Sequence, residues 1–245
     1  MEIQIEEVMI AVISRLLEGV RHVAVGNASP IPGSASLLAE ELSAGSMRVS
    51  MLGSGRDQFW TDGGVELFDC AGQGRIDAFF LGGGQIDGEA NINLVGVGDY
   101  PQQKVRWSGS FGSAYLYFVV PRVILFRDEH TRRVMVDQVD FISAPGLSEK
   151  NVYRRGGPQA LVTSLCHFSF DEDKRCFKLE SVHPGHTVEE VKDNTGFDFE
   201  CPANVPETPV LDEETMALLR GKISSRIART YPKFAEKVFG VEVSS

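Results

Sequence analysis

Residues 79–99 constrain the fold more than any other stretch of the chain. An apolar run over residues 76–81 meets the glycines Gly82, Gly83 and Gly84, which predicts a buried strand followed by a tight turn. Three glycines would free the backbone for positive φ and let a ligand approach main-chain N–H groups closely. We therefore predict a site for an oxyanion, a thioester carbonyl or a phosphate. The alternative is a strand–turn–strand link without a ligand.

Composition and charge restrict the classes of protein. The chain has 245 residues, enough for one large domain with a sizeable core, and its formal net charge of -10 argues against a nucleic-acid partner. It has no Cys-x-x-Cys pair, no signal-peptide pattern and no apolar run of about 18 residues. We expect a cytoplasmic protein with no membrane association, whose four cysteines are reduced thiols.

The first hundred residues alternate between helical and strand patterns. Helices are expected over residues 2–18, 34–42 and 64–72, the second of them capped by Ser34. Strands are expected over residues 21–26, 47–52 and 76–81. Such alternation predicts an α/β fold with an open, largely parallel sheet.

The second half of the chain is expected to be β-rich. Strand patterns occupy residues 115–126, 134–142, 160–168 and 175–182, and a short helix is expected over residues 187–192 with Thr187 as its cap. A Pro-rich linker leads to a C-terminal helix over residues 212–229 and a last short helix after Pro232. We divide the chain into a domain of residues 1–201 and a segment of residues 202–245, a linker with a C-terminal helical arm that packs on the body or on a partner.

The candidate carboxylates and cations lie at or near the glycine turn. Asp87, Glu89 and Asp99 occupy positions that suit active-site carboxylates at strand ends, although Asp is also an ordinary turn residue. Lys104 and Arg106 follow closely and would either meet phosphates or lie in solvent.

Other candidate groups carry weaker signals. The serines Ser29, Ser34, Ser54 and Ser110 lie in Gly/Pro-rich turns, but none sits in the Gly-x-Ser-x-Gly pattern of a hydrolase elbow. His183 and His186 lack a nearby third ligand, so a loop is favoured over a metal site and we expect no metal. Cys166 and His167 are neighbours on a strand and point to opposite faces.

Seven segments in one colinear order resemble the β subunit of family I coenzyme A transferases, most closely the glutaconate CoA-transferase type. They include Phe-Leu-Gly-Gly-Gly-Gln-Ile-Asp at residues 80–87 and Val-Gly-Asp-Tyr at residues 97–100; the others lie at residues 91–93, 106–110, 139–146, 157–159 and 194–198. The resemblance covers roughly residues 5–200. It implies a CoA-transferase domain over residues 1–201, a coenzyme A thioester substrate, no separate cofactor, and a homologous α subunit in an α2β2 heterotetramer.

One position departs from the transferase pattern. In the transferases a glutamate after a β-subunit strand attacks the thioester and carries the CoA. The matching stretch, residues 50–55, places Leu52 or a neighbour at this position, and the nearest downstream carboxylate, Asp57, is misplaced. Leucine cannot be acylated, so the glutamyl-CoA mechanism is not available from this chain.

In lacking this glutamate, the chain resembles a subgroup of the family that acts in actinobacterial steroid catabolism. Its heteromeric enzymes open the last ring of a steroid-derived, cholesterol-catabolic CoA thioester by hydrolytic C–C cleavage, with the necessary carboxylate expected on the α subunit. We predict a β subunit of such a hydrolase. The alternatives are a β subunit of an acyl-CoA:carboxylate CoA-transferase and a non-catalytic subunit that completes its partner's site.

The resemblance also assigns site residues. No catalytic residue is certain in this chain. The CoA-ester or oxyanion site is predicted to contain Gly82, Gly83, Gly84, Gln85, Asp87, Asn91 and Asp99. Contacts to the substrate or CoA are predicted for Ser29, Ser54, Lys104 and Arg106.

Overall fold

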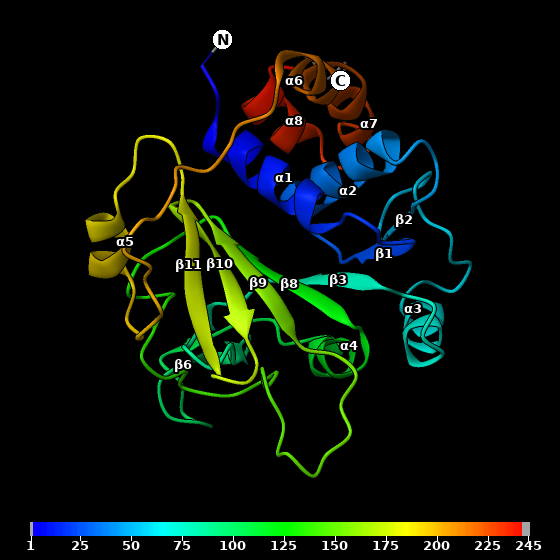
Figure 1. The fold of residues 1–245 in the computed structure, drawn as a ribbon. Helices are drawn as coiled ribbons and strands as arrows, with labels where there is room; N and C mark the ends of the chain where they lie inside the picture. The colour runs from blue at the N-terminus through cyan, green and yellow to red at the C-terminus, as the bar shows by residue number, and fades with distance from the viewer. Residues whose placement is uncertain (1, 242–245) are drawn as a thin grey trace. The chain divides into compact units, whose positions relative to one another are not determined.

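The computed structural model describes residues 2–241 (Figure 1). The chain forms two compact units. Unit 1 combines Met1–Phe80 with Pro209–Ser245, and unit 2 is Leu81–Thr208. Unit 2 is therefore an insertion, in sequence, within unit 1.

Unit 1 contains a parallel sheet with helices between its strands. Its elements in order are α1 (Ile5–Leu16), β1 (His22–Val25), α2 (Pro30–Leu42), β2 (Arg48–Met51), α3 (Gly63–Gly72) and β3 (Ala78–Leu81), the last of which ends at the unit boundary. β1 pairs in parallel with β2 and with β3. All residues of β3 are buried, as the apolar run predicts for a central strand.

The predicted helices and strands of this half are confirmed with one correction. α2 begins at Pro30 with Ser29 at the N-cap, so Ser34 is an interior residue and not the cap. Proline suits the first helical position because its missing N–H has no partner there in any case. The sequence reading started the helix four residues late because it treated Pro30 and Pro32 as part of a turn.

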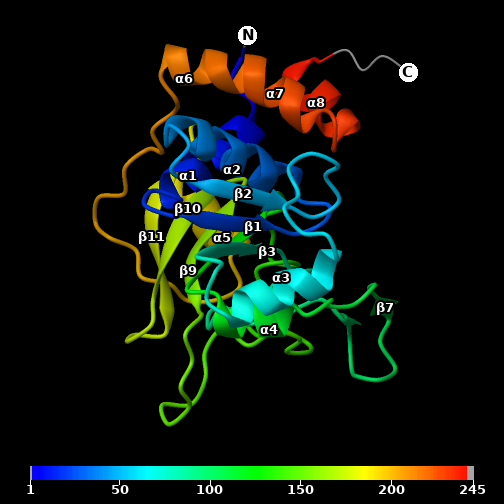
Figure 2. The same ribbon diagram turned by 90° about the vertical axis from the view of Figure 1, so that its right-hand side faces the viewer.

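The C-terminal segment of unit 1 is helical, as expected. It contains α6 (Glu213–Leu218), the π-helical turn η1 (Leu219–Ile223), α7 (Ser224–Ile227) and, after the predicted break, α8 (Pro232–Phe239). The helices lie beside α1 and α2 (Figure 2). Arg220 pairs with Glu7 of α1, and Arg226 pairs with Glu40 of α2. The arm therefore packs on the body of its own chain.

Unit 2 contains four adjacent strands and two small hairpins (Figure 1). β8 (Arg122–Arg127) pairs in parallel with β9 (Pro158–Thr163), which continues antiparallel to β10 (Cys166–Asp171) and β11 (Cys176–Val182). One hairpin pairs β4 (Gln85–Ile86) with β5 (Ile92–Asn93), and the other pairs β6 (Gly96–Val97) with β7 (Val105–Arg106). The helices of this unit are α4 (Ser113–Val119) and α5 (Val188–Asn194).

Two strand predictions in unit 2 are wrong, and the run predicted over residues 160–168 is divided between the end of β9 and the start of β10 by a bend at residues 164–165. The first part of the 115–126 run forms α4, and a strand begins only after Pro121. Residues 134–142 form no strand; a single parallel bridge joins Met135 to Ile86. In each stretch only some of the apolar residues are buried, among them Leu116 and Tyr117 in the first and Val134 and Met135 in the second. A short helix or loop with one buried side gives an apolar run like that of a strand.

The predicted fold class, α/β with a largely parallel sheet, is confirmed by the parallel pairing of β1 with β2 and β3, and of β8 with β9. The helix expected over residues 187–192 is also confirmed, because Thr187 accepts a hydrogen bond from the Glu190 N–H at 3.1 Å. Among residues 2–241, no helix is both long and apolar enough to cross a membrane. The division of the chain at residue 201 stays a prediction.

Candidate functional site

The carboxyl ends of β1 and β2 form one edge of the sheet in unit 1. The two strands are in register, with Val25 opposite Met51. Leu52 follows β2 directly, and its N–H donates to the Val25 carbonyl at 3.0 Å. Ligands of open α/β sheets bind in the crevice outside the carboxyl ends of the strands. Leu52 therefore lies where a ligand of this fold class would be expected.

The turn after Leu52 requires a glycine. Gly53 has a φ of +81°, and a Cβ there would lie 3.2 Å from Oδ1 of Asn27 in the turn after β1. The two turns thus lie close together at this edge. A larger residue at position 53 would be strained both by its backbone and by its neighbour.

The two predicted serines of this edge build turns. Ser29 is 8% exposed, and its hydroxyl donates to the Asn27 carbonyl at 3.2 Å. Ser54 is 6% exposed, and its hydroxyl accepts the N–H groups of Arg56 and Asp57 at 3.3 and 2.9 Å. Both hydroxyls have partners within the chain, and their predicted role as substrate or CoA contacts stays a prediction.

Asp57 is the carboxylate nearest to Leu52 in the downstream sequence, and it is held by an arginine. Its Oδ1 accepts from Nη2 and Nε of Arg226 at 2.6 and 2.9 Å. The carboxylate therefore joins the C-terminal helical segment to the turn after β2. It is committed to this ion pair, in agreement with the interpretation that the nucleophile of the transferases has no replacement at Asp57.

The glycine turn of unit 2 is explained by close packing. None of Gly82, Gly83 and Gly84 is among the positive-φ residues of the described chain. A Cβ on Gly84 would lie 2.2 Å from the ring of Trp107, and one on Gly83 would lie 2.8 Å from the Gln85 carbonyl oxygen. The N–H of Gly84 donates to the Asn93 carbonyl at 2.9 Å. The expectation of positive φ was wrong, and Gly84 does not offer its N–H to an oxyanion.

Asp87 closes the loop between β4 and β5. Its Oδ1 accepts the N–H groups of Glu89 and Asn91 at 3.1 and 3.0 Å, and its Oδ2 accepts from Nδ2 of Asn91 at 3.1 Å. Oδ1 of Asn91 in turn accepts the N–H of Gly146 at 3.0 Å. Burial raises the pKa of Asp87, and these hydrogen bonds oppose the increase. The carboxylate is buried, and both of its oxygens accept hydrogen bonds from the loop, as is typical of a structural turn residue.

Gln85 belongs to the same polar network. Its Oε1 accepts from Nδ2 of Asn93 at 2.7 Å and from the N–H of Asp140 at 3.0 Å. Oδ1 of Asn93 accepts the N–H groups of Val95 and Gly96 at 2.9 and 3.3 Å. The network attaches the loop of residues 139–146 to the two hairpins. Sequence reasoning missed Asp140 and Trp107 as parts of this arrangement, because residues distant in sequence gave no signal of contact.

The remaining predicted residues lie on or beside the β6–β7 hairpin. Asp99, Lys104 and Arg106 are exposed. Nη1 of Arg106 donates to Oε1 of Gln103 at 3.0 Å, and its guanidinium lies 6.0 Å from the ring centroid of Tyr100. The hairpin therefore presents cations to solvent, whereas Gln85, Asp87 and Asn91 are buried. The structure does not bring the seven predicted residues of the glycine-turn site together as one ligand-facing set.

The histidine pair of residues 183–186 has other partners. Nδ1 and Nε2 of His183 lie 2.8 Å from Oγ1 of Thr208 and 2.9 Å from the Thr163 carbonyl oxygen. Nδ1 of His186 lies 2.9 Å from Oε2 of Glu190. Across residues 2–241, no group of three or more His, Cys, Asp or Glu side chains is arranged to hold a metal ion.

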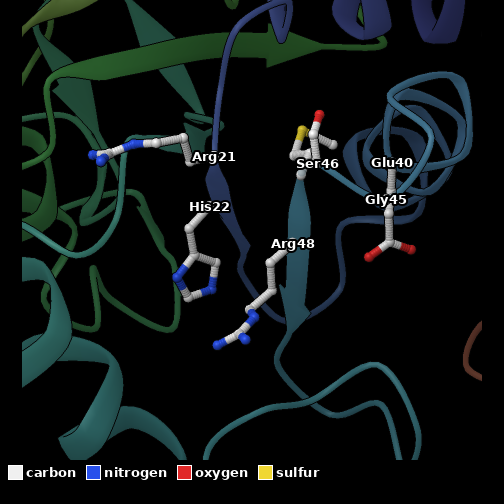
Figure 3. Close-up of a pocket in the computed structure, with 7 residues that line it drawn as sticks. Arg21, His22, Glu40, Gly45, Ser46 and Arg48 are labelled. Carbon is white, nitrogen blue, oxygen red and sulfur yellow. The ribbon is translucent and has the colours of Figure 1, made fainter.

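Two cavities that sequence reasoning missed lie at the opposite, amino edge of the sheet in unit 1. The first has a volume of about 460 Å³ and is lined by residues at the starts of β1 and β2 and by the end of α2 (Figure 3). The second has a volume of about 370 Å³ and shares Arg21, His22 and Arg48 with the first.

Comparison with known proteins gives a consistent set of matches. Residues 8–194 match the family model described as coenzyme A transferase. One subunit of the 3-oxoadipate CoA-transferase of Pseudomonas knackmussii is 34% identical over 153 residues, which are 60% of this chain and 58% of that protein. The cholesterol ring-cleaving hydrolase IpdB subunit of Rhodococcus jostii is 30% identical over 168 residues, 67% of this chain and 66% of that protein.

A solved structure shows the same fold. Rhodococcus jostii RHA1 IpdAB has a TM-score of 0.78 at 23% sequence identity, with 90% of this chain and 94% of that chain covered. The matched segments span less than two thirds of the length of either curated relative.

Proposed function

The chain belongs to the coenzyme A transferase family, and on that basis we propose that it is the β subunit of a heteromeric hydrolase that opens the last ring of a steroid-derived CoA thioester by C–C cleavage. Its partner in this proposal is a homologous α subunit, and the complex is an α2β2 heterotetramer. The substrate brings its own coenzyme A, and no further cofactor is proposed.

The observation that carries the proposal is the side chain at the carboxyl end of β2. Leu52 lies there and cannot form the covalent intermediate of a CoA-transferase. The nearest downstream carboxylate, Asp57, is held by Arg226. A family member without this nucleophile is suited to a reaction in which water, and not an enzyme carboxylate, attacks the substrate. The resemblance to the Rhodococcus jostii hydrolase subunit also supports a hydrolytic reaction.

The proposed reaction is hydrolysis of a ring ketone. A base takes a proton from water as the oxygen adds to the carbonyl carbon, and the resulting alkoxide collapses with cleavage of the adjacent C–C bond. The electron pair of this bond moves toward a neighbouring carbonyl as an enolate, which is protonated by the acid form of the base. The former ketone carbon becomes a carboxylic acid, which loses its proton to solvent. The base is assigned to the α subunit. This chain would form part of the CoA-ester pocket at the edge that contains Leu52.

A CoA-transferase β subunit is the second candidate, because the 3-oxoadipate CoA-transferase of Pseudomonas knackmussii has the higher sequence identity. A third candidate is a non-catalytic subunit that completes the site of its partner. The buried hydrogen bonds of Gln85, Asp87 and Asn91 favour this third candidate, since they give the family motif a structural role.

One experiment separates these functions. The chain is purified with a homologous α subunit and assayed with a ring-ketone CoA thioester, with and without a carboxylate acceptor. A hydrolase forms ring-opened product in water alone, whereas a transferase requires the acceptor and releases a new CoA ester. The chain purified alone should show little turnover, and robust turnover by the lone chain would contradict the proposal.

A further inference from the structure

The amino edge of the sheet in unit 1 contains a positively charged cleft. Its two cavities share three residues: Arg21 and His22 at the start of β1 and Arg48 at the start of β2. His22 and Arg48 are register partners in the parallel sheet, and the guanidinium of Arg48 extends toward the imidazole (Figure 3). The cleft lies at the end of the strands opposite to Leu52.

Arginine supplies most of the charge of this cleft. Arg75 joins Arg21 and Arg48 in lining the second cavity, where Asp77 is the single acidic residue of the lining. Asp77 is paired with Arg21 at 2.9 Å. Within residues 2–241, neither Arg48 nor Arg75 forms an ion pair. A chain with a net charge of -10 therefore carries a local excess of positive charge here.

Two further contacts define the walls. The guanidinium of Arg48 lies 4.8 Å from the ring centroid of Phe59, a cation–π distance that restricts its orientation. Glu40 lines the first cavity, but its oxygens accept from Nη1 of Arg226 at 2.7 Å and from the Val49 N–H at 3.2 Å. The carboxylate of Glu40 is thus already neutralised, and Arg48 keeps its charge for a ligand.

The imidazole of His22 is held in place by two hydrogen bonds. Nδ1 lies 3.0 Å from the Arg75 carbonyl oxygen and must carry the proton, so Nε2 accepts from the Ser50 hydroxyl at 2.8 Å. Burial, more than the charge of Arg48, lowers the pKa of this imidazole. The imidazole therefore forms part of the wall of the cleft, and its proton signals can be used to detect ligand binding.

We propose that this cleft, separate from the CoA-ester pocket proposed at the Leu52 edge, binds a diphosphate group, either as a free anion or as part of a nucleoside diphosphate. Guanidinium groups recognise phosphate oxygens through paired N–H donors, and Arg48 and Arg75, whose charges no ion pair offsets within residues 2–241, supply two positive charges for two linked phosphates. The volumes of about 460 and 370 Å³ exceed the size of a single phosphate. The C-terminal ends of α2 and α3 border the cleft and oppose an anion, so recognition depends on the arginines.

The first measurement is isothermal titration calorimetry of the full chain with inorganic pyrophosphate at low ionic strength. We expect one site per chain, with binding at least tenfold weaker in Arg48→Ala and in Arg75→Ala. Arg48→Lys keeps the charge but removes the paired donors, and it should also weaken binding. Arg133→Ala is the matched control, because Arg133 is an exposed arginine of unit 2 paired with Glu129.

The second measurement separates the two sources of the diphosphate. If the group belongs to a nucleoside diphosphate, ADP binds more tightly than pyrophosphate and displaces it, and Arg48→Ala weakens both. If the ligand is a free anion, pyrophosphate binds equally well in the presence of ADP. In either case, pyrophosphate should raise the pKa of His22, measured from its imidazole proton signals, because the anion offsets the charge of Arg48.

Two results would overturn the proposal. One is the absence of pyrophosphate and ADP binding at millimolar concentration. The other is binding that Arg48→Ala and Arg75→Ala leave unchanged, or that Arg133→Ala weakens to the same extent. The melting temperature of each variant establishes that it is folded, which is expected because Arg48 and Arg75 are exposed. Neither result depends on the reaction that the enzyme catalyses.

Discussion

The side-chain amide of Asn93 donates a 2.7 Å hydrogen bond to Oε1 of Gln85, from one strand of the β4–β5 hairpin to the other. Asn93 is fully buried and Gln85 is 5% exposed. The pair is therefore removed from water, and each side chain satisfies further backbone groups. The segments of residues 80–87 and 91–93, which carry the family resemblance, therefore stabilise the interior of unit 2.

Removal of the Asn93 side chain should lower the stability of the protein. Asn93→Ala leaves the N–H groups of Val95 and Gly96 without their acceptor, at a cost of about 1–3 kcal/mol for each group left unsatisfied. It also removes one of the two hydrogen bonds that Oε1 of Gln85 accepts, while the bond from the Asp140 N–H remains. Chemical denaturation should show a decrease of at least this size in the free energy of unfolding. Asn151→Ala, at an exposed position, is the control. Equal stability of the two variants would contradict the structural role.

Gly84→Ala should lower stability through its contact with Trp107. The added Cβ would lie 2.2 Å from the indole, so the ring must move. The double variant Gly84→Ala/Trp107→Ala should recover part of the loss, with a coupling of about 0.5–3 kcal/mol in a double-mutant cycle. If Gly84→Ala instead abolished turnover without a change in melting temperature, the oxyanion hypothesis for this glycine would be supported against the packing explanation.

Breaking the buried ion pair of Glu7 and Arg220 should lower the free energy of unfolding strongly. Glu7 is fully buried, and its carboxylate accepts from Nε and Nη2 of Arg220 at 2.6 and 2.7 Å. Arg220→Ala leaves this carboxylate uncompensated, and we expect a loss of about 3–5 kcal/mol. Arg133→Ala removes an exposed partner of Glu129 and should cost about 1 kcal/mol or less. Denaturation curves of both variants test the difference.

Acid should destabilise the protein through three histidines, of which His130 and His183 are buried and His167 is half-buried. Burial lowers the pKa of His130, His167 and His183 to about 4 in the folded state. In the unfolded chain a histidine has a pKa of about 6.5. Between these values the unfolded state binds protons that the folded state does not, so the free energy of unfolding falls as the pH falls from about 6.5 toward 4.

The contribution of one histidine can be isolated. His130→Gln should reduce the slope of unfolding free energy against pH by up to about 1.4 kcal/mol per pH unit in this window. His186→Gln is the comparison, since His186 is partly exposed and paired with Glu190. An unchanged slope in His130→Gln would mean that other groups cause the acid sensitivity.

Leu52→Glu tests the alignment of the strand end. A glutamate there should form a covalent CoA adduct when the α/β complex is incubated with an acyl-CoA, without gaining ring hydrolysis. Mass spectrometry of the intact subunit detects the adduct, and Leu52→Gln is the matched variant that cannot form it. The lack of any adduct would show that position 52 does not face the thioester.

Periodicity predicted the fold class and most elements, and its failures have two causes. The apolar run at residues 115–120 fits a strand or a short helix, and the helix that buries Leu116 and Tyr117 is selected by tertiary packing that the local sequence does not indicate. The cap of α2 was missed for a different reason, since Pro30 fits both a turn and a first helical turn.

The candidate site was harder to predict than the fold. Glycines beside polar residues read equally well as an oxyanion site or as close packing, and only the contacts of Gly84 with Trp107 and Asn93 decide between them. The arginine cleft gave no signal, because Arg21, Arg48 and Arg75 belong to three separate segments that meet only in the folded sheet. Position 52 was informative because a missing carboxylate can be seen without a structure.

The interrupted course of unit 1 affects the order in which the protein can fold during synthesis. Arg220 and Arg226, the partners of Glu7 and Glu40, are translated only after all of unit 2 has been translated. Until then Glu7 of α1 lacks the arginine with which it pairs in the folded protein. Unit 2, continuous in sequence, does not depend on these later residues for its own contacts, whereas α1 and α2 must wait for residues 220–226 to emerge.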